Sequence, residues 1–434
     1  MLRLIQSNHM PVLAQLFCEQ SQQVADPFIP TTVVVQSFGI GQWLKLQLAE
    51  HQGISANLDC ILPANYIWRL YRELLPDTKL PEESPFDRDR LAWRLMRLTP
   101  EMQEDVFKSY LSTAGDPDIR LFQLSYQIAQ LYDQYLVYRP QWPVAWERDV
   151  ALLDDTTLAQ QRWQIKLWQQ VIADAPDIAN LHRARLHQSL LTRINEQPTL
   201  PDGFSNKLSI FGLSSMARMQ LDTFQALSRI IDVDVYFLNP CQHYWGDIVA
   251  PKDKAKRSVR ALLNAEQTLS DEDYLTVGNP LLGSLGKQGR EYLELLLETD
   301  NISTHELFVD IDSESILGTI KTDILNLEYG GAFDTQPAQR PLPEGNSIQI
   351  HAAHSRMREV EILYDQLLAI FDQQPDIEPK NVIVMAPDIS AYAPFINAVF
   401  KDKIHFGIAD RTLIQQSTLI ASFFKIIALP GSRL

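Results

Sequence analysis

The sequence has few cysteines and lacks any long apolar run. Its 434 residues include three cysteines, which lie far apart: Cys18, Cys60 and Cys241. This number and spacing exclude a disulfide framework and a cysteine-based zinc module, and they fit a reducing compartment. No apolar run reaches the roughly 18 residues of a membrane span, because Lys425 interrupts even residues 419–429. Residues 1–10 lack the pattern of a secretion signal. We therefore expect a soluble cytoplasmic protein without a membrane segment.

The sequence also lacks an excess of positive charge. Thirty-eight Lys and Arg stand against 54 Asp and Glu, which leaves a net charge of −16. A protein of this charge does not attract nucleic acid over its whole surface, so a nucleic-acid site would have to be a local channel. Basic residues do gather in two helical stretches: Arg88, Arg90, Arg94 and Arg97, and then His182, Arg183 and Arg185. The alternative is that these are solvated helix faces.

A phosphate-binding loop is missing from the position where a nucleotide-binding fold needs one. Such a loop has the pattern G-x-x-x-x-G-K-[ST] between a strand and a helix. The first predicted strand is followed only by Ser7-Asn8-His9-Met10, which can cap a helix but cannot wrap a triphosphate. Residues 283–288 (Gly-Ser-Leu-Gly-Lys-Gln) have the wrong glycine spacing, and glutamine replaces the metal-binding hydroxyl. No carboxylate follows the strand predicted at 207–212. The sequence predicts no ATP hydrolysis by this chain.

Other catalytic patterns are incomplete. Residues 375–380 (Pro-Asp-Ile-Glu-Pro-Lys) resemble a compressed nuclease motif, but its carboxylates and lysine are crowded into a turn and cannot converge on one metal from adjacent strands. Residues 212–216 lack the second glycine of a nucleophile elbow. His351 and His354 have no third ligand nearby in the sequence. We expect no catalytic site, no metal site and no cofactor, and thus a chain that is not an enzyme by itself.

Strand-like and helix-like patterns alternate along much of the chain, which predicts the α/β class. We expect an α/β domain from residues 1–85 and 200–331, a helical insertion at 86–199, a proline-containing linker at 332–346, and the start of a second α/β domain, truncated, at 347–434. Predicted strands cover 2–6, 32–36, 57–61, 207–212, 233–238, 347–352 and 381–385. Outside the insertion, helices are expected at 11–23, 42–51, 64–75, 217–231, 357–371, 391–400 and 418–429, a turn at 37–41, and a polar loop at 251–257.

Aromatic, amide and arginine residues gather near predicted strand ends and on helices. Gln36 and Gln42 flank the turn after the second strand, at the carboxyl edge of a sheet, where ligands usually bind. Trp68 lies on the next helix, and Asp133 and Arg139 lie in the run 131–140. Stacking faces combined with amide and guanidinium groups are typical of channels for single-stranded nucleic acid. Taken singly, the same residues are better explained as core positions of helices, for Trp68 and the tyrosines, and as a turn position, for Gln36.

Several long segments resemble the RecC family, the gamma chain of bacterial exodeoxyribonuclease V (the RecBCD helicase–nuclease). They are residues 35–44, 53–59, 133–140, 239–247, 278–282 with Gly286-Lys287, and 354–361. The segments follow the family's order along the whole chain. Because RecC subunits are much longer, the chain resembles roughly their amino-terminal two-fifths.

This resemblance implies a superfamily-1 helicase-like (P-loop NTPase-like) fold with decayed ATPase motifs, whose parts are 1A-like, 1B-like and 2A-like. It implies a non-catalytic, DNA-binding subunit of an ATP-dependent helicase and exonuclease in double-strand break repair and homologous recombination. The chain would contact RecB and RecD, which use ATP and Mg²⁺, and would bind single-stranded and forked DNA. Such a subunit guides the 3′-ended strand and scans it for Chi. The alternative is an interaction scaffold for RecB that binds no DNA as an isolated fragment.

The resemblance also carries over recognition residues, position by position. They are Gln36, Gln42, Leu62, Trp68, Leu131, Asp133, Arg139 and Arg183. Trp68 would stack on a base, the glutamines would read base edges, Asp133 would accept from guanine, and the arginines would contact guanine or phosphate. Phe38 stands where the family has a small hydroxyl residue, and Gln130 where it has an acidic one. The DNA sequence that is read is therefore left open.

Overall fold

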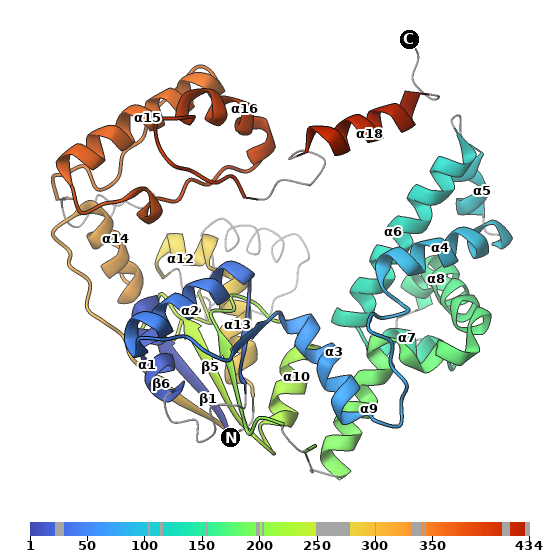
Figure 1. The fold of residues 1–434 in the computed structure, drawn as a ribbon. Coiled ribbons are helices and arrows are strands. Elements are labelled where there is room, and N and C mark those ends of the chain that lie inside the picture. The colour runs from blue at the N-terminus through green and yellow to red at the C-terminus, as the bar shows by residue number, and fades with distance from the viewer. Residues whose placement is uncertain are drawn as a thin grey trace, which may run out of the picture. The chain divides into compact units, whose positions relative to one another are not determined.

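The computed structural model describes two compact units, one spanning Met1–Glu344 and the other Gly345–Leu434 (Figure 1). The residues described are 1–21, 30–102, 105–112, 116–150, 152, 155–196, 200–201, 204–248, 278–299, 301–330, 341, 343–409 and 417–429. The loop predicted at 251–257 lies outside them, as does most of the linker predicted at 332–346. Each unit is considered by itself.

A six-stranded parallel sheet forms the centre of the first unit, in the order β3-β2-β4-β5-β1-β6. Its strands are β1 (Leu2–Ser7), β2 (Thr31–Val35), β3 (Leu58–Ile61), β4 (Lys207–Phe211), β5 (Asp232–Leu238) and β6 (Ile302–Glu306). The first five correspond to predicted strands. The edge strand β6 was not predicted, because its residues Ser303, Thr304 and His305 are polar and it pairs on one side only.

Helices cover both faces of this sheet. Successive residues of a strand point to opposite faces, so Val33 and Val35 belong to one apolar core and Val34 to the other. The first core is closed by α1 (Met10–Ser21) and α2 (Phe38–Gln52). The second is closed by α3 (Pro63–Leu74), α9 (Arg183–Glu196), α10 (Arg218–Leu227), α12 (Pro280–Leu285) and α13 (Lys287–Leu297). The predicted α/β class is confirmed by this layered arrangement.

The turn predicted at 37–41 is wrong, because α2 begins there. Ser37 caps the helix, its hydroxyl oxygen accepting a hydrogen bond from the backbone N–H of Ile40 at 3.3 Å. Gly41 is needed for packing rather than for a turn: a β-carbon on it would lie 2.8 Å from the β-carbon of Cys60 on β3. Position 41 therefore requires a residue without a β-carbon, because α2 packs closely against β3. The same close packing determines the position of the side chains at the start of α2.

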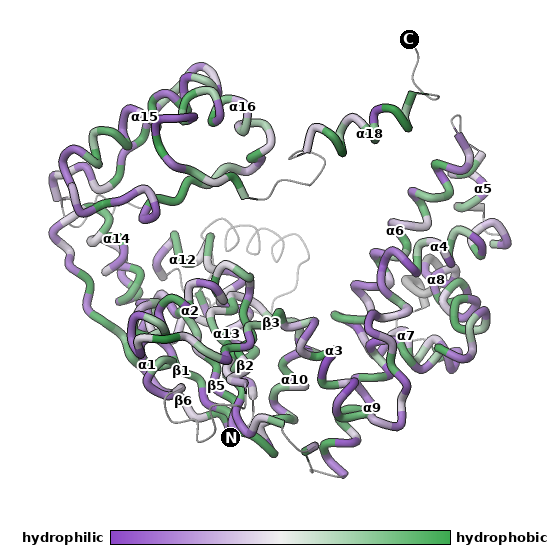
Figure 2. Tube along the Cα trace, in the orientation of Figure 1, coloured by the Kyte–Doolittle hydropathy of each residue, from purple (hydrophilic) through white to green (hydrophobic). Residues whose placement is uncertain are grey.

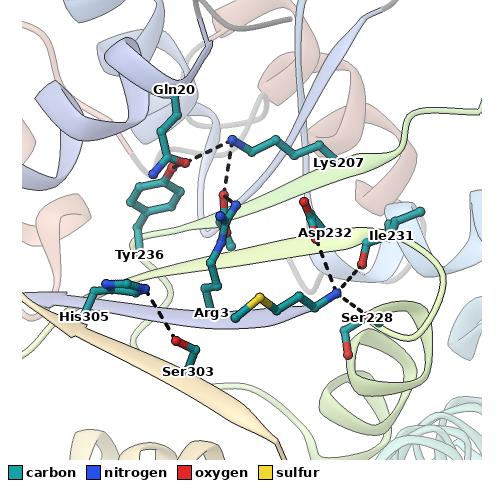
Figure 3. A network of polar contacts seen from close by, with 11 residues as sticks. Arg3, Gln20, Lys207, Ser228, Ile231, Asp232, Tyr236, Ser303 and His305 are labelled. Atoms are coloured by element: carbon teal, nitrogen blue, oxygen red, sulfur yellow. Dashed lines mark hydrogen bonds and ion pairs between the residues drawn. The ribbon is translucent and has the colours of Figure 1, made fainter.

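A buried carboxylate joins three of the strands (Figure 3). Asp234 on β5 is 0% exposed and accepts a hydrogen bond from the Arg3 guanidinium of β1 at 2.8 Å. The ammonium of Lys207 on β4 lies 3.3 Å from the same carboxylate. Gln20 on α1 accepts from Lys207 and from the hydroxyl of Tyr236. This network ties the middle of the sheet to α1.

The stretch predicted to be a helical insertion contains only helices in its described part. They are α4 (Arg88–Leu98), α5 (Asp105–Leu111), α6 (Pro117–Tyr138), α7 (Gln141–Trp146), α8 (Asp155–Asp174) and α9. Along α4 and α6 the hydropathy changes from turn to turn, as expected of amphipathic helices (Figure 2). These helices share a separate core around Tyr132 and Trp168.

Helix α9 belongs to two cores at once. Ala184, near its first residue, is part of the core of the helical region. Leu186, Leu190 and Ile194, further along, are part of the second core of the α/β sheet. Arg183, the first residue of the helix, therefore stands where the helical region meets the α/β layers.

The second unit contains α15 (Arg356–Gln373), α16 (Ile389–Phe400) and α18 (Thr418–Ala428), while α14 (Ile316–Leu325) still belongs to the first. Val360 and Leu367 of α15 pack against Val399 and Phe400 of α16. The strands predicted at 347–352 and 381–385 are wrong: both segments pair with no strand in the described part of the chain. A strand exists only through the ladder it forms with a neighbour.

Candidate nucleic-acid interface

The carboxyl end of β1, where a nucleotide-binding loop would lie, is occupied by the chain itself. The side-chain amide of Asn8 donates to the carbonyl oxygen of Val309 at 2.8 Å and accepts from the N–H of Val309 at 2.9 Å. Helix α1 begins two residues later, at Met10. The segment after β1 thus makes a short link to the segment after β6 rather than a glycine-rich phosphate cradle.

The other weak motifs have structural explanations. Residues 283–285 are the end of α12 and residues 287–288 the start of α13, so helical residues, not a strand, directly precede them and Gly286 alone joins the two helices. A β-carbon on Gly286 would lie 2.5 Å from the carbonyl oxygen of Leu282. In the turn at 375–380, exposed Lys380 pairs with Glu378 at 2.6 Å. His351 contacts the side chain of Gln349 at 3.1 Å. Within the described ranges, no three His, Cys, Asp or Glu residues are grouped so as to hold a metal ion.

Two of the predicted recognition residues lie at the carboxyl edge of the sheet. The amide nitrogen of Gln36, just past β2, donates to the hydroxyl of Ser214 at 3.0 Å, and its oxygen accepts from the Ser214 N–H at 3.3 Å. Because β2 and β4 are neighbours, this pair bridges the ends of adjacent strands. Gln42 is exposed on α2, one turn after Phe38, whose ring is 70% exposed. These side chains face solvent together at one edge.

Trp68 lies on α3, which begins at Pro63 directly after Leu62. Proline at the first position of a helix suits its fixed φ and costs no hydrogen bond. The indole N–H of Trp68 donates to the carbonyl oxygen of Pro81 at 3.2 Å, and its ring meets Tyr71 edge to face at 6.0 Å. The indole is half-buried and held in one orientation, as a stacking platform requires.

Arg183 contacts one other predicted residue, Asp133. Its guanidinium donates to Asp133 of α6 at 2.7 Å and to Asp87, just before α4, at 2.8 Å. The side chains are between a quarter and two-fifths exposed, so the contacts form at a wet surface. Burial raises the pKa of Asp87, and the Arg183 guanidinium opposes that shift. Three helices are thereby connected at one point.

Two cavities adjoin at Arg183 and Asp87. The first, of about 470 Å³, is lined by Trp68 and Arg183 among others. The second, of about 520 Å³, is lined by Gln130, Asp133 and again Arg183. Because Arg183 and Asp87 line both, the two cavities lie next to each other between α3 and α6, and we call the pair the Arg183 groove. The structure thus brings together four of the predicted residues.

The other predicted residues lie outside both cavities. Gln36, Phe38 and Gln42 lie at the sheet edge, and Leu62 is the residue that caps α3. Leu131 is partly buried on α6. Arg139 is exposed at the carboxyl end of α6 and donates to the carbonyl oxygen of Tyr138 at 3.1 Å. These side chains could reach a ligand that extends beyond the groove.

The sequence did not reveal several residues that line the groove. Asp87 is 96 positions from Arg183, and no local pattern indicates that they pair. Asn65 and Gln220 add amides from α3 and α10. Tyr71 is 1% exposed, and its hydroxyl has no hydrogen-bond partner among the described residues. Burial raises the pKa of this hydroxyl, so it stays protonated and able to donate.

A second polar cluster fixes the backbone on either side of Arg183. The Glu147 carboxylate accepts from His182 at 2.8 Å and from the Arg185 guanidinium at 2.6 Å. The other ring nitrogen of His182 accepts from the N–H of Arg185 at 3.4 Å, so Nε2 carries the proton in the neutral ring. Burial lowers the pKa of His182. Burial acts to raise the pKa of Glu147, but the hydrogen bonds and charges of His182 and Arg185 together outweigh it and lower that pKa.

The fold and the groove define a class: a layered α/β protein with a helical region, whose polar groove carries stacking, amide and guanidinium groups. A family model described as RecC, N-terminal domain, matches residues 2–327. The chain is 36% identical over 469 residues to "RecBCD enzyme subunit RecC" of Escherichia coli (strain K12), covering 100% of this chain and 41% of that protein. The chain belongs to the RecC family.

Further relatives carry the same name. The protein of Haemophilus influenzae is 36% identical over 477 residues, with 97% of this chain and 41% of the relative covered. That of Mycolicibacterium smegmatis is 27% identical over 447 residues, with 95% and 37% covered. The chain spans about two-fifths of the length of these curated relatives. In the described part of the chain, no helix is both long and apolar enough to cross a membrane.

Proposed function

We propose that this chain is a DNA-binding, non-catalytic part of a RecBCD-type helicase and exonuclease that acts in double-strand break repair and homologous recombination. Its relatives are named as subunits of the RecBCD enzyme. The observation that carries the proposal is the Arg183 groove, in which Trp68, Gln130, Asp133 and Arg183 come together from three helices. RecB and RecD would be its partners and would use the ATP and Mg²⁺.

The helicase-like origin of the fold is part of the same proposal. A parallel sheet flanked by helices on both faces is the architecture on which nucleotide-driven motors are built, and their phosphate loop follows a strand. Here the carboxyl end of β1 is linked to the chain after β6 through Asn8 and Val309. We regard this as a nucleotide site replaced by a structural contact. The fold would then have lost the nucleotide site of a helicase and kept a binding site for the DNA strand, the Arg183 groove.

Each residue of the groove has a chemical role in reading an unpaired strand. Asp133 binds Arg183 through Oδ1, so Oδ2 can accept from the N–H groups of guanine. Trp68 offers a fixed indole face on which a base can stack. Arg139, exposed at the end of α6, can reach guanine acceptors or phosphate. The 3′-ended strand would pass along this groove and be scanned there for Chi.

The local charge explains how an acidic protein could do this. The net charge of −16 opposes general attraction to DNA, and the Arg183 groove itself mixes carboxylates with guanidinium groups. Binding there would rest on contacts to bases as well as to phosphates, and so would depend on base identity. Phe38 and Gln130 lie at positions that would alter which bases are preferred.

The test is a fluorescence-anisotropy titration of the chain with labelled single-stranded DNA across a salt series. We expect binding that weakens as salt increases, because phosphate contacts release counterions. Trp68→Ala should weaken binding by about 1–3 kcal/mol, the effect of one base stack. Trp68→Phe keeps a stacking ring, so it should retain most of the affinity and serves as the matched variant.

Two results would contradict the proposal. Absence of binding even at low salt would favour the alternative in which the chain is an interaction scaffold for RecB. Binding by the wild-type chain with no change in Trp68→Ala would remove Trp68 from the site. Urea unfolding of each variant controls for loss of fold, since Trp68 also packs against the second core of the sheet.

A further inference from the structure

A row of aromatic rings lies on the surface of the helical region, and its innermost ring, Tyr126, also packs against the core of that region. Trp93 of α4 is 66% exposed, and its ring centre lies 5.6 Å from that of Phe122 on α6. The Phe122 ring lies 5.9 Å from that of Tyr126, one turn further along. The Arg88 guanidinium sits 4.8 Å above the Tyr126 ring. We call these four side chains the aromatic ledge.

The ledge continues into the Arg183 groove. Arg88, its last member, lines the same cavity as Gln130, Asp133 and Arg183. On α6, residues Phe122, Tyr126, Gln130 and Asp133 follow one another at spacings of four, four and three, which places them on one face of the helix. At a rise of about 1.5 Å per residue, that face extends for about 16 Å. Helices α4 and α6 lie side by side along it (Figure 1).

The surroundings of the ledge favour nucleobases over a protein partner. The exposed residues near the rings on α6 include Gln123, Gln127 and Gln130, whose amides can hydrogen-bond to base edges, together with the apolar Ile119, which is 55% exposed. Protein interfaces are also enriched in aromatic and arginine side chains. The ledge, however, is continuous with the Arg183 groove through Arg88, and this continuity favours the strand proposed to occupy the groove. Aromatic faces alternating with a guanidinium are the surface on which unpaired bases stack without regard to sequence.

We propose that the aromatic ledge is a second DNA-binding surface, on which the unpaired bases of a single strand stack as the strand continues from the Arg183 groove. This inference rests on the proposed function and extends it. The groove would read base identity through polar contacts. The ledge would hold the adjoining nucleotides by stacking, with little preference among bases.

The experiment compares two labelled probes with the full chain: an oligothymidylate, and an oligomer of equal length whose sugars carry no bases. Trp93→Ala and Phe122→Ala should each weaken binding of the oligothymidylate by about 5- to 100-fold. Neither should change binding of the base-free oligomer, because that probe has nothing to stack. Tyr244→Ala is the matched control, since it removes a 57% exposed ring outside the ledge and should leave both affinities unchanged.

The outcomes separate the ledge from the proposed function. If the wild-type chain binds neither probe, both proposals are overturned. If it binds and Trp68→Ala weakens binding while Trp93→Ala and Phe122→Ala do not, the ledge alone is refuted. If Trp93→Ala and Phe122→Ala lose as much affinity for the base-free oligomer as for the oligothymidylate, base stacking on the ledge is refuted. Variants that keep DNA affinity but lose association with a RecB-type subunit would show that the ledge contacts protein.

Discussion

Removal of the carboxylate of Asp234 should destabilise the first unit strongly. The side chain is 0% exposed and holds the Arg3 guanidinium and the Lys207 ammonium, whose side chains are 28% and 27% exposed. In Asp234→Ala, both cations would remain close together, partly buried and without their common partner. The Arg3 pKa is raised mainly by its hydrogen bond to Asp234, so this contact stabilises the charged guanidinium.

The magnitude follows from the burial of the three groups. Loss of one member of a buried ion pair costs about 3–5 kcal/mol. Because Arg3 and Lys207 each keep about a quarter of their exposure, the lower end applies, and we expect a loss of about 3 kcal/mol. Asp232, two residues away on the same strand, is 55% exposed. Asp232→Ala should therefore cost at most about 1 kcal/mol, as exposed ion pairs do.

Urea unfolding followed by tryptophan fluorescence measures this difference. All eight tryptophans precede residue 345, so the signal reports on the first unit alone. The slope of free energy against urea should stay the same in both variants, which would show that only stability changes. A loss in Asp234→Ala no larger than that in Asp232→Ala would refute the reasoning that the buried carboxylate holds β1, β4 and β5 together.

Three further expectations follow. Gly41→Ala should lower the free energy of unfolding in urea by about 1–3 kcal/mol, since the new β-carbon would lie 2.8 Å from that of Cys60 on β3. Gly39→Ala should be tolerated, because the nearest atom to its β-carbon is 3.6 Å away. Equal losses of stability in the two variants would contradict this reasoning. Burial lowers the pKa of His182 below its ordinary value of 6.5, so its neutral form favours folding and that stability is lost as pH falls below about 6.5. His182→Gln can still donate to Glu147 but cannot titrate, so its urea midpoint should fall less as the pH is lowered. If the midpoints of wild type and variant fall in parallel with pH, His182 is not the source of the pH dependence. Arg139→Ala should relax sequence preference in the reconstituted assembly; an unchanged response to the recognised sequence would count against its role.

The sequence predicts the strands of the sheet where several apolar, β-branched residues follow one another, as in β2 with Val33, Val34 and Val35. It misses β6, because an edge strand with one neighbour does not need an apolar pattern on both faces. The alternation around Ile350 and Ile383 suggests strands in the second unit, yet these side chains are 95% and 80% exposed. Residue pattern alone cannot tell whether a neighbouring strand exists.

The sequence indicates which residue types line the candidate site, but it does not predict how they are arranged in space. The amide, aromatic and guanidinium residues on α6 and α9 were identified from the sequence, and three of them, Gln130, Asp133 and Arg183, line one cavity. Which residues meet depends on contacts between distant helices, as with Arg183 and Asp87. The same holds for Gln36 and Ser214, which are 178 positions apart. The aromatic ledge was not predicted, because its rings lie on two helices.

Helix α9 has a consequence for how the first unit unfolds. Because its beginning is embedded in one core and its remainder in another, neither core can open without fraying the same helix. Amide hydrogens along α9 should therefore exchange only through an opening that involves both regions, and should be among the slowest of the unit. The residues near Arg183 would then keep their positions through local fluctuations elsewhere, and the Arg183 groove would lose its shape only when the whole unit unfolds.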